Sequence, residues 1–188
     1  MNILEKIALK TRERVEEAKQ NKPLKILQEE VFELIDKEKN IKKEDFRFEK
    51  SIKSFNVQNK MAFICEVKKA SPSKGLIDKD FHYLDIAHEY ENAGAAAISV
   101  LTEPYFFQGS NAYLNEISKS VQTPLLRKDF TIDEYQIYVA RLIGASAVLL
   151  IASLLKEEEI AKFIKLNDSL GLCSLVEAHT ENEVQSAL

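Results

Sequence analysis

The sequence has 188 residues, of which 45% are hydrophobic and 30% charged, and its net charge of −4 gives no basic footprint for nucleic acid. No apolar run is long enough to cross a membrane, and the first six residues carry charges where a signal peptide has its apolar core. Two cysteines in apolar runs, Cys65 and Cys173, are interpreted as small buried hydrophobic residues, so we expect a cytoplasmic protein without disulfides or metal that binds neither nucleic acid nor membrane.

The first 58 residues predict a helical extension without a catalytic constellation. An incomplete apolar stripe among many charges predicts a helix over residues 2–20, and Pro23 separates it from a second predicted helix over residues 24–37. The lysine-rich segment 37–43 is predicted to be a solvated loop. A short docking helix or turn is marked by Phe46, Phe48 and Ile52. We interpret residues 1–58 as an extension that lies over the mouth of the following domain as a lid or support.

From Met61 on, strand-like apolar runs alternate with helical patterns. The predicted strands are Ala62–Val67, Ala96–Leu101, Pro124–Arg127, Ala147–Ile151 and Cys173–Glu177. The predicted helices are Tyr83–Asn92, Asn111–Ser118, Thr131–Leu142, Lys156–Leu170 and a last helix that begins at Glu181. Residues 180–183 also have the form of a capping box. Five βα units in succession predict a parallel sheet covered by helices.

Two parallel-sheet architectures compete for this alternation. A doubly wound sheet that binds a dinucleotide has a glycine-rich first turn, but residues 68–75 (KKASPSKG) lack the Gly-x-Gly-x-x-Gly pattern. A (βα)8 barrel instead places polar residues at the C-terminal ends of several strands, as this sequence does. The predicted fold class is therefore α/β, a (βα)8 TIM barrel, with strands one to five in residues 59–188 after the extension at 1–58.

Charged residues stand at the ends of three predicted strands. Glu66 and Lys68 are two residues apart and therefore share a face, while Lys128 follows the third strand and Glu177 ends the fifth. In a barrel these side chains meet at one mouth, where two acids and two ammonium groups suit general acid–base catalysis. Each residue alone also fits an ordinary solvated charge or ion pair. Their joint position on three strands favours an active site.

The segment 102–110 after the second strand contains three consecutive aromatic residues, Tyr105, Phe106 and Phe107. Aromatic side chains in a polar loop can line a pocket for an aromatic ring. They can equally anchor the loop onto the top of the barrel. The residue pattern alone leaves both interpretations open.

At these residues the chain resembles the indole-3-glycerol-phosphate synthase family, whose members are (βα)8-barrel lyases of tryptophan biosynthesis. The resemblance runs from the N-terminal helix to Leu188 and rests on four motifs. They are residues 66–75 (EVKKASPSKG), 99–110 (SVLTEPYFFQGS), 126–130 (LRKDF) and 175–177 (LVE). The resemblance implies ring closure, decarboxylation and dehydration of 1-(2-carboxyphenylamino)-1-deoxyribulose 5-phosphate to indole-3-glycerol phosphate. It also implies that neither a metal nor an organic cofactor takes part.

The resemblance further implies a role for each candidate site residue. Lys128 would be the general acid that protonates the substrate ketone, and Glu177 would stabilise developing charge and help to move protons. Glu66 and Lys68 would form the pair on the first strand, with Lys68 contacting substrate anions and assisting dehydration. The implied substrate-binding residues are Ser71, Phe107 and Lys68, of which Phe107 contacts the anthranilate ring.

The number of βα units departs from the family pattern. A (βα)8 barrel typically has about 250 residues, and in this family the last three strands carry further substrate-binding residues and the loops that grip the phosphate. We therefore expect a truncated synthase that is inactive alone and self-associates through open sheet edges. Two alternatives stay open: another phosphate-handling barrel enzyme similar to phosphoribosylanthranilate isomerase, and a non-catalytic barrel fragment that associates with a partner.

Overall fold

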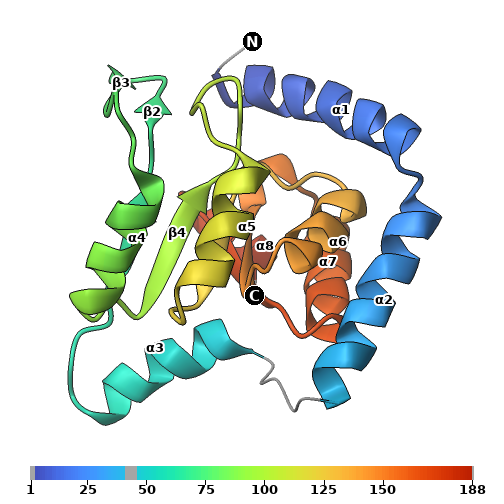
Figure 1. The fold of residues 1–188 in the computed structure, drawn as a ribbon. Helices are drawn as coiled ribbons and strands as arrows, with labels where there is room; N and C mark the ends of the chain where they lie inside the picture. Colours follow the sequence, from blue (N-terminus) through green and yellow to red (C-terminus); the bar gives the residue numbers. More distant parts are fainter. Residues whose placement is uncertain (1–2, 41–45, 188) are drawn as a thin grey trace.

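A parallel sheet of five strands forms the centre of the computed structural model, which describes residues 3–40 and 46–187. The strand order β1-β4-β5-β6-β7 follows the chain, so each strand lies beside the next main strand in the sequence (Figure 1). The strands are β1 (Ile64–Val67), β4 (Ala97–Leu101), β5 (Leu125–Lys128), β6 (Ala147–Ile151) and β7 (Cys173–Glu177). This is the order of consecutive strands in a (βα)8 barrel.

Helices connect the strands and cover the outer face of the sheet. They are α4 (Tyr83–Asn92), α5 (Asn111–Ser120), α6 (Glu134–Leu142), α7 (Glu157–Ser169) and α8 (Glu181–Ala187), with a short 3-10 helix, η1 (Ala152–Leu154), after β6. The five predicted strands and the helices after them are confirmed, with boundaries that agree to within three residues. The largest difference is at α6, where Asp133 is extended and its carboxylate accepts a hydrogen bond from Tyr135 N at 2.9 Å. This cap starts the helix at Glu134 instead of Thr131.

One local prediction is wrong, and one local feature was not predicted. The second helix, α2 (Leu24–Asn40), continues through the start of the predicted loop, because Glu38 in its last turn forms an ion pair with Arg141 of α6. Residues 41–43 of that loop lie outside the described residues. The antiparallel hairpin after β1, which β2 (Ala70–Ser71) and β3 (Gly75–Leu76) form, was not predicted. Gly75 has a φ of +66°, a conformation that favours glycine in such a tight turn.

The three helices before β1 lie in three different places. Helix α1 (Ile3–Asn21) lies at the end of the sheet where the strands end, α2 lies beside α6, and α3 (Arg47–Val57) lies at the opposite end (Figure 1). Ser51 of α3 donates a hydrogen bond to Ala96 O at 2.7 Å, just before β4 begins. Of these helices, α1 is therefore the one beside the barrel mouth. The division of the chain at residues 58 and 59 stays a prediction.

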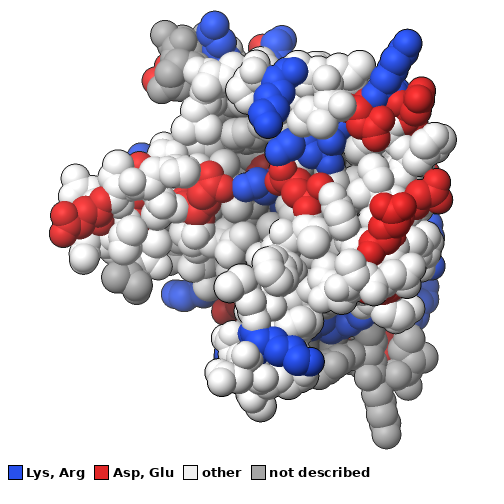
Figure 2. Space-filling view, turned by 90° about the vertical axis from the view of Figure 1, so that its left-hand side faces the viewer, with Lys and Arg blue, Asp and Glu red and all other residues white. Residues whose placement is uncertain are grey.

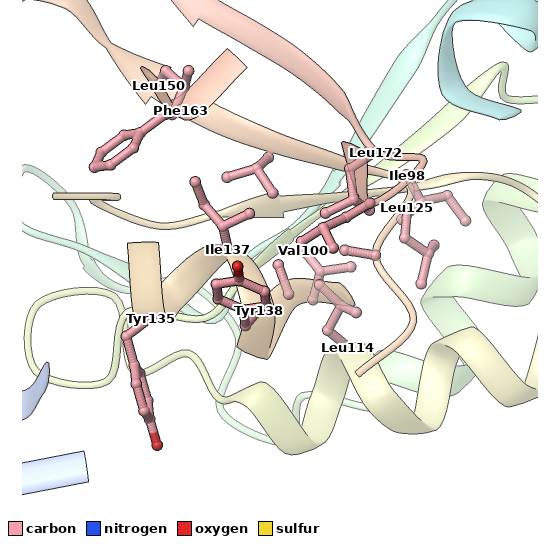
Figure 3. Close-up of a cluster of buried hydrophobic side chains, with 14 of the residues drawn as sticks. Ile98, Val100, Leu114, Leu125, Tyr135, Ile137, Tyr138, Leu150, Phe163 and Leu172 are labelled. Atoms are coloured by element: carbon pink, nitrogen blue, oxygen red, sulfur yellow. The ribbon is translucent and has the colours of Figure 1, made fainter. Parts of the chain in front are cut away.

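The sheet is packed on both faces. Side chains such as Ile98, Val100 and Leu150 point outward and pack with α5, α6 and α7 in the main core (Figure 3). A second, smaller core lies on the inner face and includes Leu126 and Leu149. Neighbouring residues of a strand thus alternate between the two cores. This alternation determines which strand-end charges point into the barrel.

The sheet is open within the described part of the chain, since β1 pairs only with β4 and β7 only with β6. The predicted self-association through these edges stays a prediction. No helix among the described residues is long and apolar enough to span a membrane. Basic and acidic side chains lie side by side near the centre of the face in Figure 2, and neither sign dominates that face.

Candidate active site

A cavity of about 370 Å³ lies at the C-terminal ends of the strands. It is lined by Leu4, Glu66, Lys68, Leu101, Phe107, Lys128, Asp129, Phe130, Leu149, Ile151 and Glu177. Five of the six residues predicted for the site are therefore brought together. A larger hollow of about 740 Å³ lies beside α3, where β7 begins. Active sites of (βα)8 barrels lie at the C-terminal ends of the strands, so the smaller cavity is the candidate.

Lys128 and Glu177 form an ion pair inside this cavity. Lys128 ends β5 and Glu177 ends β7, and Lys128 Nζ lies 2.8 Å from Glu177 Oε2. Burial raises the pKa of Glu177, but hydrogen bonds and positive charge from Lys128 and His179 outweigh burial and leave the pKa below its ordinary value. The pair therefore presents a carboxylate next to an ammonium group, both half-buried and both facing the cavity.

Glu66 and Lys68 form a second ion pair in the same cavity. Glu66 lies on β1 and Lys68 follows the strand by one residue, so their side chains share a face, as the spacing predicts. Both side chains are half-buried. The cavity therefore holds two acids and two cations on three strands, a set that can donate and accept protons and bind anionic groups.

Phe107 supplies an aromatic wall of the cavity and packs on Phe130, with ring centroids 6.0 Å apart. Glu103, which is 1% exposed, holds the loop around Phe107. Its carboxylate accepts backbone hydrogen bonds from Tyr105, Phe106 and Phe107 at 2.7–3.1 Å. Glu103 thus anchors the loop, which leaves the Phe107 ring facing the cavity.

Ser71 does not line the cavity. It lies in the β2–β3 hairpin, where its Oγ accepts a hydrogen bond from Lys74 N at 3.2 Å. Its role in substrate binding stays a prediction.

Asp129 is the centre of a buried charge cluster directly beside the site. Its Oδ1 accepts hydrogen bonds from Arg14 Nη2 and Phe130 N, both at 2.8 Å, and its Oδ2 accepts from Thr102 Oγ1 at 2.8 Å and Arg127 Nη2 at 2.6 Å. Burial raises the pKa of Asp129, but the charges of Arg127 and Arg14 outweigh burial and hold it below its usual range. Asp129 therefore stays ionised and ties α1 to the end of β5.

The predicted set of site residues omitted Glu103, Asp129, Phe130 and His179. Asp129 had a usable signal, because two opposite charges stand two residues apart, at positions 127 and 129, where a buried strand ends, and buried charges must pair. His179 had no such signal, since the sequence shows it as a lone histidine in a loop. Among the described residues, no group of three or more His, Cys, Asp or Glu side chains is arranged to hold a metal ion.

Known proteins that are similar to this chain share one family name. A family model described as indole-3-glycerol phosphate synthase matches residues 4–188. A relative of that name from Ruminiclostridium cellulolyticum is 53% identical over 186 residues, which cover 99% of this chain and 68% of the relative. Similar relatives of the same name occur in Endomicrobium trichonymphae, at 52% identity, and Lachnoclostridium phytofermentans, at 47%, again over 99% of this chain and 68–69% of theirs.

These matches confirm the resemblance seen in the four motifs and the prediction of a (βα)8-barrel fold. They do not favour a different phosphate-handling barrel enzyme or a non-catalytic fragment. The chain belongs to the indole-3-glycerol phosphate synthase family of tryptophan-biosynthesis enzymes.

Proposed function

We propose that this protein is a carboxy-lyase that converts 1-(2-carboxyphenylamino)-1-deoxyribulose 5-phosphate into indole-3-glycerol phosphate. The observation that supports this most is the Lys128–Glu177 ion pair at 2.8 Å, which shares its cavity with the Glu66–Lys68 pair. We also infer a cytoplasmic setting, which two free thiols at Cys65 and Cys173 support.

Lys128 acts as the general acid in this proposal. As the aromatic carbon attacks the ketone carbon, the ketone oxygen gains electron density and takes a proton from Lys128 Nζ. The new ring then loses carbon dioxide, which restores the aromatic system. The neighbouring Glu177 carboxylate stabilises the positive charge that develops on the ring nitrogen, because the two opposite charges attract at short range.

Dehydration completes the indole ring. The hydroxyl group must leave as water, which requires a second proton, and a carbon-bound proton must be removed to form the double bond. Lys68 assists departure of the water and binds substrate anions, and a carboxylate of the site accepts the carbon-bound proton. The ion pairs with Glu66 and Glu177 keep both lysines in place for these steps.

The walls of the cavity suit the rest of the substrate. Phe107 and Phe130 offer an apolar surface for the anthranilate ring, since aromatic faces pack favourably against each other. A volume of about 370 Å³ is within the range of small-molecule sites. We expect Phe107 to contact the ring directly.

The test is turnover measured from the fluorescence of the indole product. Two proteins are compared: residues 1–188, and a fusion of residues 1–188 with the part of the Ruminiclostridium cellulolyticum relative that lies outside the match. In a (βα)8 barrel the remaining strands close the sheet. We expect turnover by the fusion and far slower turnover by residues 1–188, whose sheet is open beside the cavity. A folded fusion with no turnover would contradict the proposed function.

A further inference from the structure

Both oxygens of the Glu177 carboxylate have a partner. Oε2 lies 2.8 Å from Lys128 Nζ, and Oε1 lies 3.0 Å from Nε2 of His179. The carboxylate therefore bridges an ammonium group inside the cavity and an imidazole ring outside it. None of the four sequence motifs includes His179.

The backbone of His179 is held in place by the first turn of α8. His179 N donates a hydrogen bond to Glu183 Oε2 at 2.7 Å, and Glu183 N donates to Thr180 Oγ1 at 3.3 Å. This is the predicted capping box shifted by one residue, since Glu183 bonds to residue 179 instead of 180. The box directs the chain so that the imidazole returns to the end of β7. The ring itself is 69% exposed, so it meets Glu177 from the solvent side.

We propose that His179 is a positioning residue for the Lys128–Glu177 pair. The inference rests on the proposed function, because it assigns a role to a neighbour of the proposed acid–base pair. With one oxygen held by His179, the carboxylate cannot turn away from Lys128 without losing a second hydrogen bond. The charged groups that share the cavity with Glu177 are Lys128, Asp129, Glu66 and Lys68. His179 approaches from the opposite, solvent-exposed side.

The test follows the Glu177 carboxyl carbon by NMR in residues 1–188 with ¹³C-labelled glutamate. Glu177→Gln identifies the signal, and the titration midpoint of Glu177 is compared in the parent, His179→Phe, His179→Gln and His82→Phe. His82 is the matched control, because it is another exposed histidine and lies before α4, away from the cavity. Amide spectra of each variant establish that it is folded.

We expect the midpoint of Glu177 to rise in His179→Phe, because a donor and a positive charge beside the carboxylate are lost. In His179→Gln the midpoint should lie between those of the parent and His179→Phe, since the glutamine amide can still donate a hydrogen bond. His82→Phe should leave the midpoint unchanged. Equal midpoints in the parent and His179→Phe, or equal rises in His179→Phe and His82→Phe, would overturn the proposal.

A second arm measures turnover in the fusion described above. His179→Phe should lower kcat roughly threefold to tenfold with little change in KM, the effect of one lost hydrogen bond at the reacting groups. His179→Gln should recover part of the loss, and His82→Phe should have parental kcat. Unchanged kcat in His179→Phe would contradict a positioning role. A parent fusion without turnover would contradict the proposed function, while the NMR comparison would still decide whether His179 holds Glu177.

Discussion

Two charge clusters meet at the end of β5 and differ in almost every physical respect. Arg127 points to the outer side of the strand and pairs with Asp129, the residue after the strand, and these side chains are 2% and 0% exposed. Lys128, between them in sequence, points inward to Glu177, and these side chains are 28% and 33% exposed. Alternation along β5 thus separates Arg127 from Lys128, and Asp129, which also borders the cavity, is held by Arg127 in the buried cluster.

The buried cluster leaves its carboxylate little freedom. Asp129 accepts four hydrogen bonds, one of which comes from Arg14 on α1. The half-buried pair faces a cavity of about 370 Å³, so a bound substrate can replace part of the water around the pair. The buried cluster therefore stabilises the barrel end, while the half-buried pair remains available for chemistry.

Asp129→Asn should have the largest effect on stability. Loss of the carboxylate leaves two guanidinium groups without their anion, and breaking a buried ion pair costs about 3–5 kcal/mol. Urea unfolding of residues 1–188 measures the free energy of unfolding, with Lys128→Met as the control on the neighbouring residue. Lys128→Met should cost much less, since its ion pair is partly exposed. Equal losses of unfolding free energy in the two variants would contradict the difference between the buried cluster and the half-buried pair.

Phe107→Ala should weaken binding of the aromatic part of the substrate by about 1–3 kcal/mol, because an aromatic wall of the cavity is lost. Binding of anthranilate and of ribose 5-phosphate to the fusion is measured by fluorescence and calorimetry. Tyr105→Ala is the control, because Tyr105 is an exposed aromatic residue of the same loop that does not line the cavity. If Phe107→Ala weakens the binding of both ligands alike, Phe107 supports the loop and does not contact the ring.

The pH dependence of stability gives the smallest effect. The folded pKa of Asp129 is lowered, so its contribution is fully present above the unfolded pKa, about 4, and is lost as pH falls toward the folded pKa. The difference in thermal midpoint between the parent and Asp129→Asn should be constant from pH 8 to 5 and should narrow below about pH 4. A difference that stays constant down to pH 3 would show that Asp129 is not the titrating group.

The sequence was sufficient to predict the parallel βα units and the four strand-end charges. The reason is that buried apolar runs and strand alternation are local patterns, visible at Leu126 and Lys128 without knowledge of the fold. The roles assigned to Lys128 and Phe107 came from the family resemblance and not from spacing. Contacts between distant segments could not be predicted, and the Arg14–Asp129 contact joins residues 115 positions apart.

Short-range geometry set a second limit on prediction. The β2–β3 hairpin has two residues in each strand, too few for a periodic signal, so the sequence did not predict that Ser71 lies in a hairpin. The position of His179 depends on a capping box whose acceptor is one residue from the expected one. Differences of one residue decide which side chain reaches Glu177, and hydrophobic periodicity does not resolve them.

We propose that the half-buried Lys128–Glu177 pair performs chemistry while the buried cluster around Asp129 maintains structure. The most direct test is turnover by the fusion carrying Lys128→Met, with its thermal midpoint measured on the same sample. We predict that kcat falls roughly 10²- to 10⁴-fold while substrate binding and the thermal midpoint change little, as expected when one general acid is removed. A folded variant whose kcat stays within about threefold of the parent, well short of the loss expected for a missing general acid, would contradict the account.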